Sequence, residues 1–390
     1  MPDPFLLLRL SAISLLFLTS LVDSLTLSSD IAALKAFKAS INPATIQPFA
    51  CLGSWNFSTD PCANPRRVHF TCGVNCDDTP AAGPSRVTQI TLDPAGYSGT
   101  LSPEVGKLTR LTVLDLSNNY FFGPIPSSLS SLSNLQTLVL HSNSFSGAVP
   151  ASLCNLKSLQ SLDLSRNSLS GPLPRYLSSL IGLRRLDLSF NRLTGSLPRL
   201  PPNLLELALK ANSLSGSLYK SSFDGLTQLE VVELSDNSLS GTVEGWFFLL
   251  QSLQQVDLAN NTLARVEIWS PGKFNGDLVA VDLGFNRIEG NIPANFSAYP
   301  SLSSLSLRYN RLRGPIPWEF GKKESLKRLF LDGNYLNGTP PQGLFSSETS
   351  VSGSLGDNCL QSCPVSSQLC LKSQKPLSIC RQAYGGKPRS

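Results

Sequence analysis

The chain is poor in the residues and motifs on which enzymes and nucleic-acid-binding proteins depend. It contains two histidines, His69 and His141, among 390 residues, so a nucleophile that needs a histidine base has little to draw on. No Gly-rich phosphate loop or kinase signature occurs. No Lys/Arg run is interleaved with aromatic residues, although the formal net charge is +5. We therefore expect a protein that is not an enzyme, needs no cofactor and binds no nucleic acid.

Long apolar runs are also scarce, and the exception lies at the start of the chain. Residues 6–22 are almost wholly apolar, and Val22 and Ser24 suit the small-residue positions before a cleavage site. This pattern predicts a secretory signal peptide over residues 1–24, with a retained membrane anchor as the alternative. No later stretch approaches the ~20 apolar residues of a membrane span. The tail, residues 382–390, is polar and basic, which argues against a lipid-anchor signal. We expect a secreted protein with no membrane span of its own.

What the chain has in abundance is one pattern, Leu-x-x-Leu-x-Leu-x-x-Asn, which returns about every 24 residues. Its clear copies begin at Leu111, Leu135, Leu159, Leu183, Leu204, Leu229, Leu253, Leu278, Leu302 and Leu326. A degenerate first copy begins at Val87, with Ala95 where the asparagine would stand. A fixed period of this length marks an α/β solenoid of leucine-rich repeats, here about eleven of them.

The pattern also predicts how each repeat is built. Alternating leucines place their side chains on one face of a short strand, and the residues between them face solvent. Strands of successive copies pair in parallel at a spacing of ~4.8 Å, so the sheet would be on the order of 50 Å long. The asparagine column turns the chain out of the strand, because its amides can bond backbone groups that would otherwise be buried without partners. These asparagines are Asn119, Asn143, Asn167, Asn191, Asn212, Asn237, Asn261, Asn286, Asn310 and Asn334.

Eight of the nine cysteines lie in two groups outside the repeats. An end repeat would expose its apolar face, so solenoids need capping units, and four cysteines in each secreted cap predict two disulfides. The candidates are Cys51, Cys62, Cys72 and Cys76 in the first cap and Cys359, Cys363, Cys370 and Cys380 in the second. Three connectivities are open in each cap. In the second, Cys359–Cys363 is sterically tight but feasible, and Cys370–Cys380 would then follow. A metal site is not expected in an exported chain.

The resulting division of the chain is a signal peptide over 1–24, an N-terminal cap over 25–86, repeats over 87–345 and a C-terminal cap with a polar tail over 346–390. Within the first cap, Ser28 or Ser29 is a candidate N-cap for a helix that buries Leu34 and Phe37 and stops at Pro43. The ninth cysteine, Cys154, is expected to be a buried free thiol.

Several copies continue after the asparagine with Leu-x-Gly-x-Ile/Leu-Pro, as in Ser168-Leu-Ser-Gly-Pro-Leu-Pro174 and Arg311-Leu-Arg-Gly-Pro-Ile-Pro317. This extension resembles the plant extracellular leucine-rich-repeat family of receptor-like proteins and polygalacturonase-inhibiting proteins, here without a kinase or transmembrane segment. The resemblance implies a right-handed superhelix with the parallel sheet on its concave face, a second short strand in each repeat and 3₁₀ or helical segments on the convex side. It also implies the cap pairs Cys51–Cys72 and Cys62–Cys76, and Asn358-Cys359-Leu360 resembles the C-terminal cap of that family.

Binding in such a scaffold is expected from the solvent-facing strand positions. Exposed aromatic residues and arginines form binding hot spots. The eighth to tenth of the ten clear copies group five such residues with a lysine: Phe285, Arg308, Tyr309, Lys327, Arg328 and Phe330. The acidic residues of the same face, such as Asp163 and Asp187, are interpreted mainly as structural or solubilising. Copies five to seven lapse from the pattern, and the apolar residues 246–250 there are read as core, with a lateral patch for a second protein as the alternative.

The function expected is a secreted, non-enzymatic recognition scaffold that binds a protein or peptide, such as a receptor-kinase ectodomain, in signalling or defence. The alternative is an inhibitor of a wall-degrading enzyme, a secreted pectinase, or a wall protein that contacts pectin. The resemblance places the protein in the extracellular space, the cell wall or the outer face of the plasma membrane. Four sequons are candidate N-glycosylation sites, at Asn56, Asn260, Asn295 and Asn337. A glycan on Asn260 would obstruct copy seven.

Overall fold

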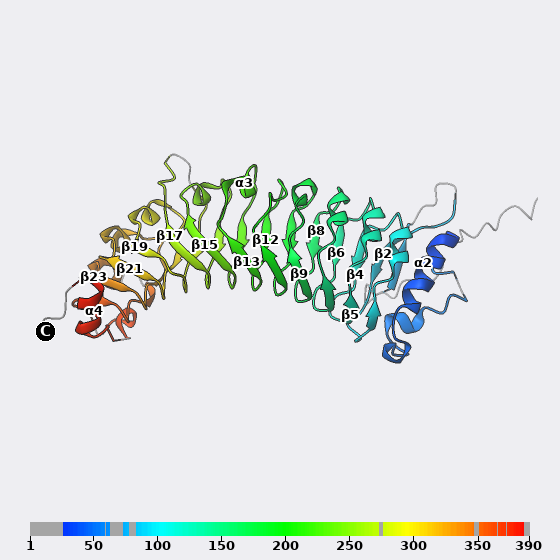
Figure 1. The fold of residues 1–390 in the computed structure, drawn as a ribbon, viewed down its shortest axis with the longest axis horizontal. Helices are drawn as coiled ribbons and strands as arrows, with labels where there is room; N and C mark the ends of the chain where they lie inside the picture. The colour runs from blue at the N-terminus through cyan, green and yellow to red at the C-terminus, as the bar shows by residue number, and fades with distance from the viewer. Residues whose placement is uncertain are drawn as a thin grey trace, which may run out of the picture.

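The computed structural model describes residues 26–58, 60–62, 73–77, 83–272, 276–346, 351–364, 366–371 and 373–385. The predicted signal peptide, Cys72 and His69 lie outside the described residues. Figure 1 shows an elongated, curved stack with the helix α2 (Ser28–Ala39) at one end and the helix α4 (Leu377–Ala383) at the other. A sheet of thirteen strands runs through the stack, so the predicted solenoid is confirmed.

The large sheet contains one strand from each predicted repeat and one from each cap. Its order is β1 (Gly73–Cys76), β2 (Val87–Thr91), β4 (Val113–Asp115), β6 (Thr137–Val139), β8 (Ser161–Asp163), β10 (Arg185–Asp187), β12 (Glu206–Ala208), β14 (Val231–Glu233), β16 (Gln255–Asp257), β18 (Ala280–Asp282), β20 (Ser304–Ser306), β22 (Arg328–Phe330) and β24 (Ser352–Ser354). Strand β1 pairs with β2 antiparallel, and from β2 onward neighbouring strands pair in parallel in constant register. The two cap strands extend the sheet beyond the predicted repeats.

Second strands follow the asparagine turns, as the family resemblance implied. They form an eight-stranded sheet of β3 (Ser98–Thr100), β5 (Tyr120–Gly123), β7 (Ser144–Gly147), β9 (Ser168–Pro172), β11 (Arg192–Gly195), β13 (Ser213–Gly216), β15 (Ser238–Val243) and β17 (Thr262–Val266), and a four-stranded sheet of β19 (Glu289–Asn291), β21 (Arg311–Gly314), β23 (Tyr335–Gly338) and β25 (Cys359–Leu360). The division between the two sheets falls after β17, directly behind the copies in which the pattern lapses. Where Gly241 meets Thr242, the pairing of β15 with β17 shifts register.

Short helical segments return the chain from the second strand to the next repeat. They are η3 (Pro103–Lys107), η4 (Ser127–Ser131), η5 (Ala151–Asn155), η6 (Leu177–Ser179), α3 (Lys220–Phe223), η7 (Phe247–Leu249), η8 (Ala294–Ala298), η9 (Trp318–Lys322) and η10 (Gln342–Phe345), with η1 (Pro43–Thr45), η2 (Cys51–Ser54) and η11 (Gln368–Cys370) in the caps. Except for α3, these segments are 3₁₀ helices, in which the N–H of residue i+3 bonds the carbonyl of residue i. This geometry is common in short pieces of this kind.

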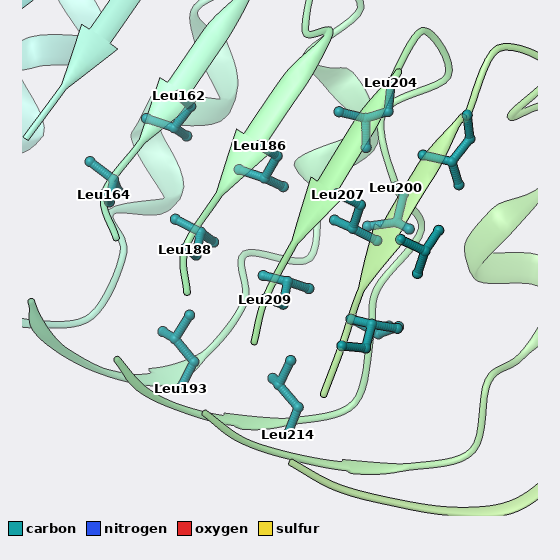
Figure 2. Close-up of a cluster of buried hydrophobic side chains, with 14 of the residues drawn as sticks. Leu162, Leu164, Leu186, Leu188, Leu193, Leu200, Leu204, Leu207, Leu209 and Leu214 are labelled. Atoms are coloured by element: carbon teal, nitrogen blue, oxygen red, sulfur yellow. The ribbon is translucent and has the colours of Figure 1, made fainter. Parts of the chain in front are cut away.

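The core is a continuous column of leucines enclosed by the strands and turns. Figure 2 shows Leu162 and Leu164, Leu186 and Leu188, and Leu207 and Leu209 at matching positions of successive strands, with second-strand leucines below them. All six are at most 2% exposed. Each repeat buries its leucines only against its neighbours, which is why the stack and not the single repeat is the stable unit.

The asparagine column joins each repeat to the one before it. Asn143 is typical: its Oδ1 accepts the backbone N–H of Phe121 at 2.9 Å, and its Nδ2 donates to the carbonyls of Leu116 and Leu140 at 2.9 and 3.2 Å. The predicted structural role of these asparagines is confirmed. Asn358 continues the column in the C-terminal cap, where its Oδ1 accepts the N–H of Leu336 and its Nδ2 donates to the carbonyl of Leu331.

The N-terminal cap is held by a buried ion pair. The Asp30 carboxylate is fully buried, accepts from both the Nε and an Nη of Arg86 at 3.0 and 3.1 Å, and also accepts the Val87 N–H. The expected N-cap at Ser28 or Ser29 is wrong, because Leu27 takes that position without a side-chain cap. The Cys62–Cys76 disulfide is present, as the family resemblance implied. The Cys51–Cys72 pairing stays a prediction, since Cys72 lies outside the described residues.

The C-terminal disulfides differ from the expected pairs. They join Cys359 to Cys380 and Cys363 to Cys370, so the expected Cys359–Cys363 and Cys370–Cys380 pairs are wrong. The cause is the path of the chain: Cys359 lies in β25, and α4 folds back over that strand and brings Cys380 beside it. Cys154 is a buried free thiol, as expected.

The apolar residues of the lapsed copies fill the core for the most part. Trp246, Phe247 and Phe248 are buried, at 8%, 0% and 1% exposure, whereas Leu249 is 40% exposed. The rings of Phe247 and Phe248 meet edge to face at a centroid distance of 5.5 Å, which is a favourable aromatic geometry. The core interpretation is confirmed for Trp246, Phe247 and Phe248, whereas Leu249 leaves a smaller apolar surface beside them.

Candidate functional site

The residue before each asparagine of the asparagine column has an unusual backbone conformation. It adopts a positive φ, near 50–56°, in residues that include Arg166, Phe190, Asn260, Phe285 and Tyr309. Non-glycine residues rarely take this conformation, and large aromatic ones more rarely still. The tight turn out of the strand imposes it on whichever residue stands there. The side chains of one column are therefore presented next to the large sheet by the fold itself.

In copies eight to ten this column carries an aromatic stack with an arginine. The rings of Phe285 and Tyr309 lie 4.8 Å apart and nearly parallel, at 12°. The Arg308 guanidinium carbon lies 5.0 Å from the Phe285 ring centre and 5.7 Å from that of Phe330. Tyr309 packs over Gly333, where an added Cβ would come within 2.5 Å of the ring. We call Phe285, Arg308, Tyr309 and Phe330 the aromatic cluster.

The other two predicted site residues occupy different places. Arg328 and Phe330 share one face of β22, opposite Ser304 and Ser306 of β20, so Arg328 extends the aromatic cluster along the sheet. Lys327 stands before β22, is exposed and does not line the hollow that Arg328 and Phe330 border. The structure thus brings five of the six predicted residues together and separates Lys327 from them.

A hollow of about 360 Å³ lies on the solvent-facing side of β14 to β22, and sequence reasoning did not anticipate it. Its near end and middle are acidic, with Glu233, Asp257 and Asp282 on β14, β16 and β18, and its far end is formed by Arg308, Arg328 and Phe330. The acidic part follows from the period, since each of these three strands contributes the residue between the second and third apolar positions of the pattern. The repeat pattern was the signal that could have grouped these residues.

Two polar atoms at the basic end of the hollow are buried without a hydrogen-bond partner. They are the Arg308 Nε and the Ser306 Oγ. An unpaired buried donor costs about 1–3 kcal/mol. Neither atom is accessible to solvent in this arrangement, so the folded chain itself bears the cost.

The acidic column has a structural role, which agrees with the interpretation from the sequence. Asp115, Asp163, Asp187, Asp257 and Asp282 each accept, through Oδ1, the backbone N–H two residues further along the chain. Burial raises the pKa of Asp187 above its ordinary value. Burial, and next the nearby charge of Asp257, raises the pKa of Glu233. The acids therefore close turns and also make the middle of the hollow electronegative.

A second arginine–aromatic pair lies at the same register far from the hollow. The Arg166 guanidinium carbon lies 4.3 Å from the Phe190 ring centre, and Phe190 is 40% exposed. Neither residue lines the hollow. This pair reproduces the local chemistry of the aromatic cluster and offers a matched control for it.

The sequon asparagines differ in setting. Asn56, Asn260 and Asn295 are exposed, whereas Asn337 is half-buried in β23. Asn260 donates through Nδ2 to the Asp236 carboxylate at 2.7 Å and stands at the edge of the large sheet. Within the described residues, no group of three or more His, Cys, Asp or Glu could hold a metal ion. No helix in that part of the chain is long and apolar enough to cross a membrane.

Fold and site together define a leucine-rich-repeat scaffold with a recognition surface on its large sheet. A model of the leucine-rich repeat region matches residues 92–332, and a model of the leucine-rich repeat N-terminal domain matches residues 27–77. The chain belongs to the plant extracellular leucine-rich-repeat family.

Individual relatives are receptor-like proteins and receptor ectodomains. Receptor like protein 27 of Arabidopsis thaliana is 32% identical over 94 residues, which cover 24% of this chain and 11% of that protein. Among solved structures, PEPR1–AtPEP1 has a TM-score of 0.75 and 32% identity and covers 86% of this chain. The plant peptide hormone receptor RGFR1 in complex with RGF2 has a TM-score of 0.64 and 33% identity and covers 67%. This chain spans 45% and 42% of those two structures, so it corresponds to less than half of each.

Proposed function

We propose that this chain is a non-enzymatic recognition protein that binds a protein or peptide along the hollow and the aromatic cluster. The observation that carries the proposal is the exposed aromatic cluster: Phe285 and Tyr309 are 42% and 38% exposed and stack at 4.8 Å, and the Arg308 guanidinium carbon lies 5.0 Å from the Phe285 ring centre. Clustered aromatic residues and arginine at one end of a groove form the usual hot spot of a protein interface. Binding would cover the exposed rings.

The surroundings favour an elongated partner. The hollow runs across five parallel strands, with acidic groups in its middle and basic groups at one end. A peptide that carries a positive charge along its length and an acceptor group near one end would match this polarity. The similarity to PEPR1–AtPEP1 and to RGFR1 in complex with RGF2 supports a role outside the plasma membrane, with a peptide or a receptor-kinase ectodomain as the partner.

The test uses the full chain, secreted from a plant host and immobilised. Partners are captured from plant wall and membrane extracts, identified, and then titrated in purified form. The variant Phe285→Ala/Tyr309→Ala/Phe330→Ala should weaken binding by about 30-fold or more, since hot-spot truncations cost about 2 kcal/mol or more. The matched control is Phe190→Ala, which removes an equivalent exposed ring outside the hollow and should leave the affinity unchanged. Equal affinity of the triple variant and the unchanged chain would overturn the assignment.

A second candidate is inhibition of a secreted pectinase, favoured by the charged hollow, since a folded enzyme with a basic rim could seat on Glu233, Asp257 and Asp282. The same capture separates the two functions. Recovery of a pectinase whose activity falls on titration with this chain supports inhibition, and recovery of a peptide or receptor-kinase ectodomain supports recognition. Pectin itself is a polyanion, so its contact is expected at Arg308 and Arg328 and not at the acidic middle.

A further inference from the structure

A second hollow, of about 410 Å³, lies between α3 and η7. Its apolar lining consists of Phe223, Leu226, Trp246, Leu249, Leu250 and Trp269, and we call it the lateral groove. Trp269 is 50% exposed and Leu249 is 40% exposed. Contiguous exposed apolar surface of this kind usually has an occupant.

The exposed tryptophan of this groove is positioned by the following repeat. Asn295 of η8 donates through Nδ2 to the carbonyl of Ile268 at 3.0 Å, and Tyr299 donates through its hydroxyl to the carbonyl of Trp269 at 3.0 Å. The indole lies against Gly245, where an added Cβ would come within 2.3 Å of Trp269 Cδ1. Gly245 therefore covers one side of the Trp269 ring, and the other side is exposed. The exposed side-chain amide of Asn295 lies beside the backbone of residues 268 and 269.

Asn295 begins the sequon Asn295-Phe296-Ser297. We propose that an N-linked glycan on Asn295 lies over Trp269 and that its first sugars occupy the lateral groove. The bond forms between Nδ2 and the anomeric carbon of an oligosaccharide carried on a lipid diphosphate. The diphosphate leaves, and the amide gives up one proton. The remaining N–H of Nδ2 keeps its hydrogen bond to the Ile268 carbonyl.

The chemistry of the groove fits a sugar. The C–H face of a pyranose packs on the electron-rich face of an aromatic ring, and Trp269 offers such a face. Lys220, Asp224 and Gln251 at the rim of the groove provide donors and acceptors for hydroxyl and N-acetyl groups. Covalent attachment beside Trp269 gives the sugars a high effective concentration at the groove, so weak contacts suffice.

The other sequons lack this combination. The Asn56 Oδ1 accepts from the N–H and hydroxyl of its own Ser58, and the Asn260 amide bonds the Asp236 carboxylate. Asn337 is half-buried in β23, where it pairs with Cys359. Asn295 alone among the four bonds a residue adjacent to the lining of the lateral groove.

The test compares three forms of the full chain secreted from yeast: fully glycosylated, stripped in the folded state by peptide N-glycosidase F, which removes each glycan and leaves aspartate, and Ser297→Ala. Hydroxyl-radical footprinting with mass spectrometry reports the oxidation rates of the tryptophan and tyrosine side chains. We expect Asn295 to be occupied, and we expect Trp269 oxidation to rise severalfold from the intact to the Ser297→Ala form. Asn295→Gln should match Ser297→Ala.

The matched control is Tyr176, which is 74% exposed beside η6 and lies several repeats away from Asn295. Its oxidation should be the same in all three forms. An unmodified Asn295, or equal Trp269 oxidation with and without the glycan, overturns the proposal. The stripped form is made from protein that has already folded, so it should show the same rise in Trp269 oxidation even if a substituted chain folds poorly.

Discussion

Inside the array each turn is closed by an asparagine of the next repeat, whereas at the two ends that asparagine is missing and other residues take over. In the interior, Asn286 bonds one N–H and three carbonyls. At the C-terminal end Gln374 takes the role of a column asparagine: its Oε1 accepts the Leu360 N–H and its Nε2 donates to the Leu355 carbonyl.

The N-terminal end uses a different device. Ala95 stands at the asparagine position, so the N–H groups of the cap need other acceptors. The Asp93 carboxylate accepts the Cys51 N–H, and the Tyr97 hydroxyl accepts the Leu52 N–H while it donates to Asp93 at 2.6 Å. Burial and the hydrogen bond to Asp93 raise the pKa of Tyr97 well above its usual range. One repeated residue thus serves the interior, but each end needs its own chemistry.

The largest effect is expected at the N-terminal end, from Asp30→Ala. The change leaves Arg86 and the Val87 N–H without their acceptor, and breaking a buried pair costs about 3–5 kcal/mol. Denaturant unfolding followed by circular dichroism gives the loss. The control is Glu104→Ala, which breaks the exposed Glu104–Lys107 pair and should cost no more than about 1 kcal/mol. Comparable losses for the two variants would mean that the buried pair does not hold the cap.

The next largest loss of stability is expected from Asn286→Ala, which removes an interior asparagine of the column. Four backbone groups lose a buried partner, and each unsatisfied group costs about 1–3 kcal/mol before relaxation. We expect a total loss of about 2–3 kcal/mol. Hydrogen exchange should show opening of the repeats on both sides, because stability in a solenoid is shared between neighbours. Asn203→Ala, which removes one exposed bond to the Ile181 carbonyl, is the control; opening confined to one side would contradict the role of the column asparagine.

A smaller loss is expected from Gln374→Ala at the C-terminal end. Gln374 is half-buried, and water can replace part of its bonding, so the cost should be about 1 kcal/mol. Exchange should accelerate at Leu360 and leave Leu263, an interior equivalent, unchanged. Uniform acceleration along the chain would show that the cap and the array unfold as one unit.

The smallest change in stability is expected from the acidic residues that the repeat places side by side on neighbouring strands. The pKa of Glu233 is raised in the folded chain by burial and then by Asp257. The folded state therefore holds the proton more tightly than the unfolded state, and stability falls as pH rises from the ordinary glutamate pKa through the raised one. Glu233→Gln should raise the melting temperature slightly at pH 7. Below about pH 4 it should have no effect, because Glu233 is then protonated in both states. A gain of equal size at both pH values would point to a cause other than ionisation.

The same contrast decides what the sequence could predict. The period placed every interior strand and asparagine, because each repeat obeys the same local rule. The end residues Asp30 and Gln374 were missed, since both stand outside the repeated pattern and no period points to their partners. Strand β24 was missed because Gly353 stands at a leucine position, where a Cβ would meet the Leu329 carbonyl at 1.8 Å.

The site was predictable to the extent that it follows the period. Register alone brings Phe285, Arg308 and Phe330 onto one surface, and strand alternation, applied strictly, separates Lys327 from Arg328. The C-terminal disulfide pairs were not predictable, because they depend on how α4 folds back over β25. The orientation of the Arg308 guanidinium depends on packing against the rings of Phe285 and Phe330, which no sequence pattern encodes.

The one free cysteine among the described residues gives the chain a chemical reporter of its own opening. Cys154 is 3% exposed in the repeat that begins at Leu135, and burial raises its pKa. A thiol reagent can reach it only when that repeat separates from its neighbours. The labelling rate of the native chain, divided by that of the unfolded chain, therefore gives the fraction of time that the repeat spends open. No probe needs to be introduced to follow the breathing of the stack.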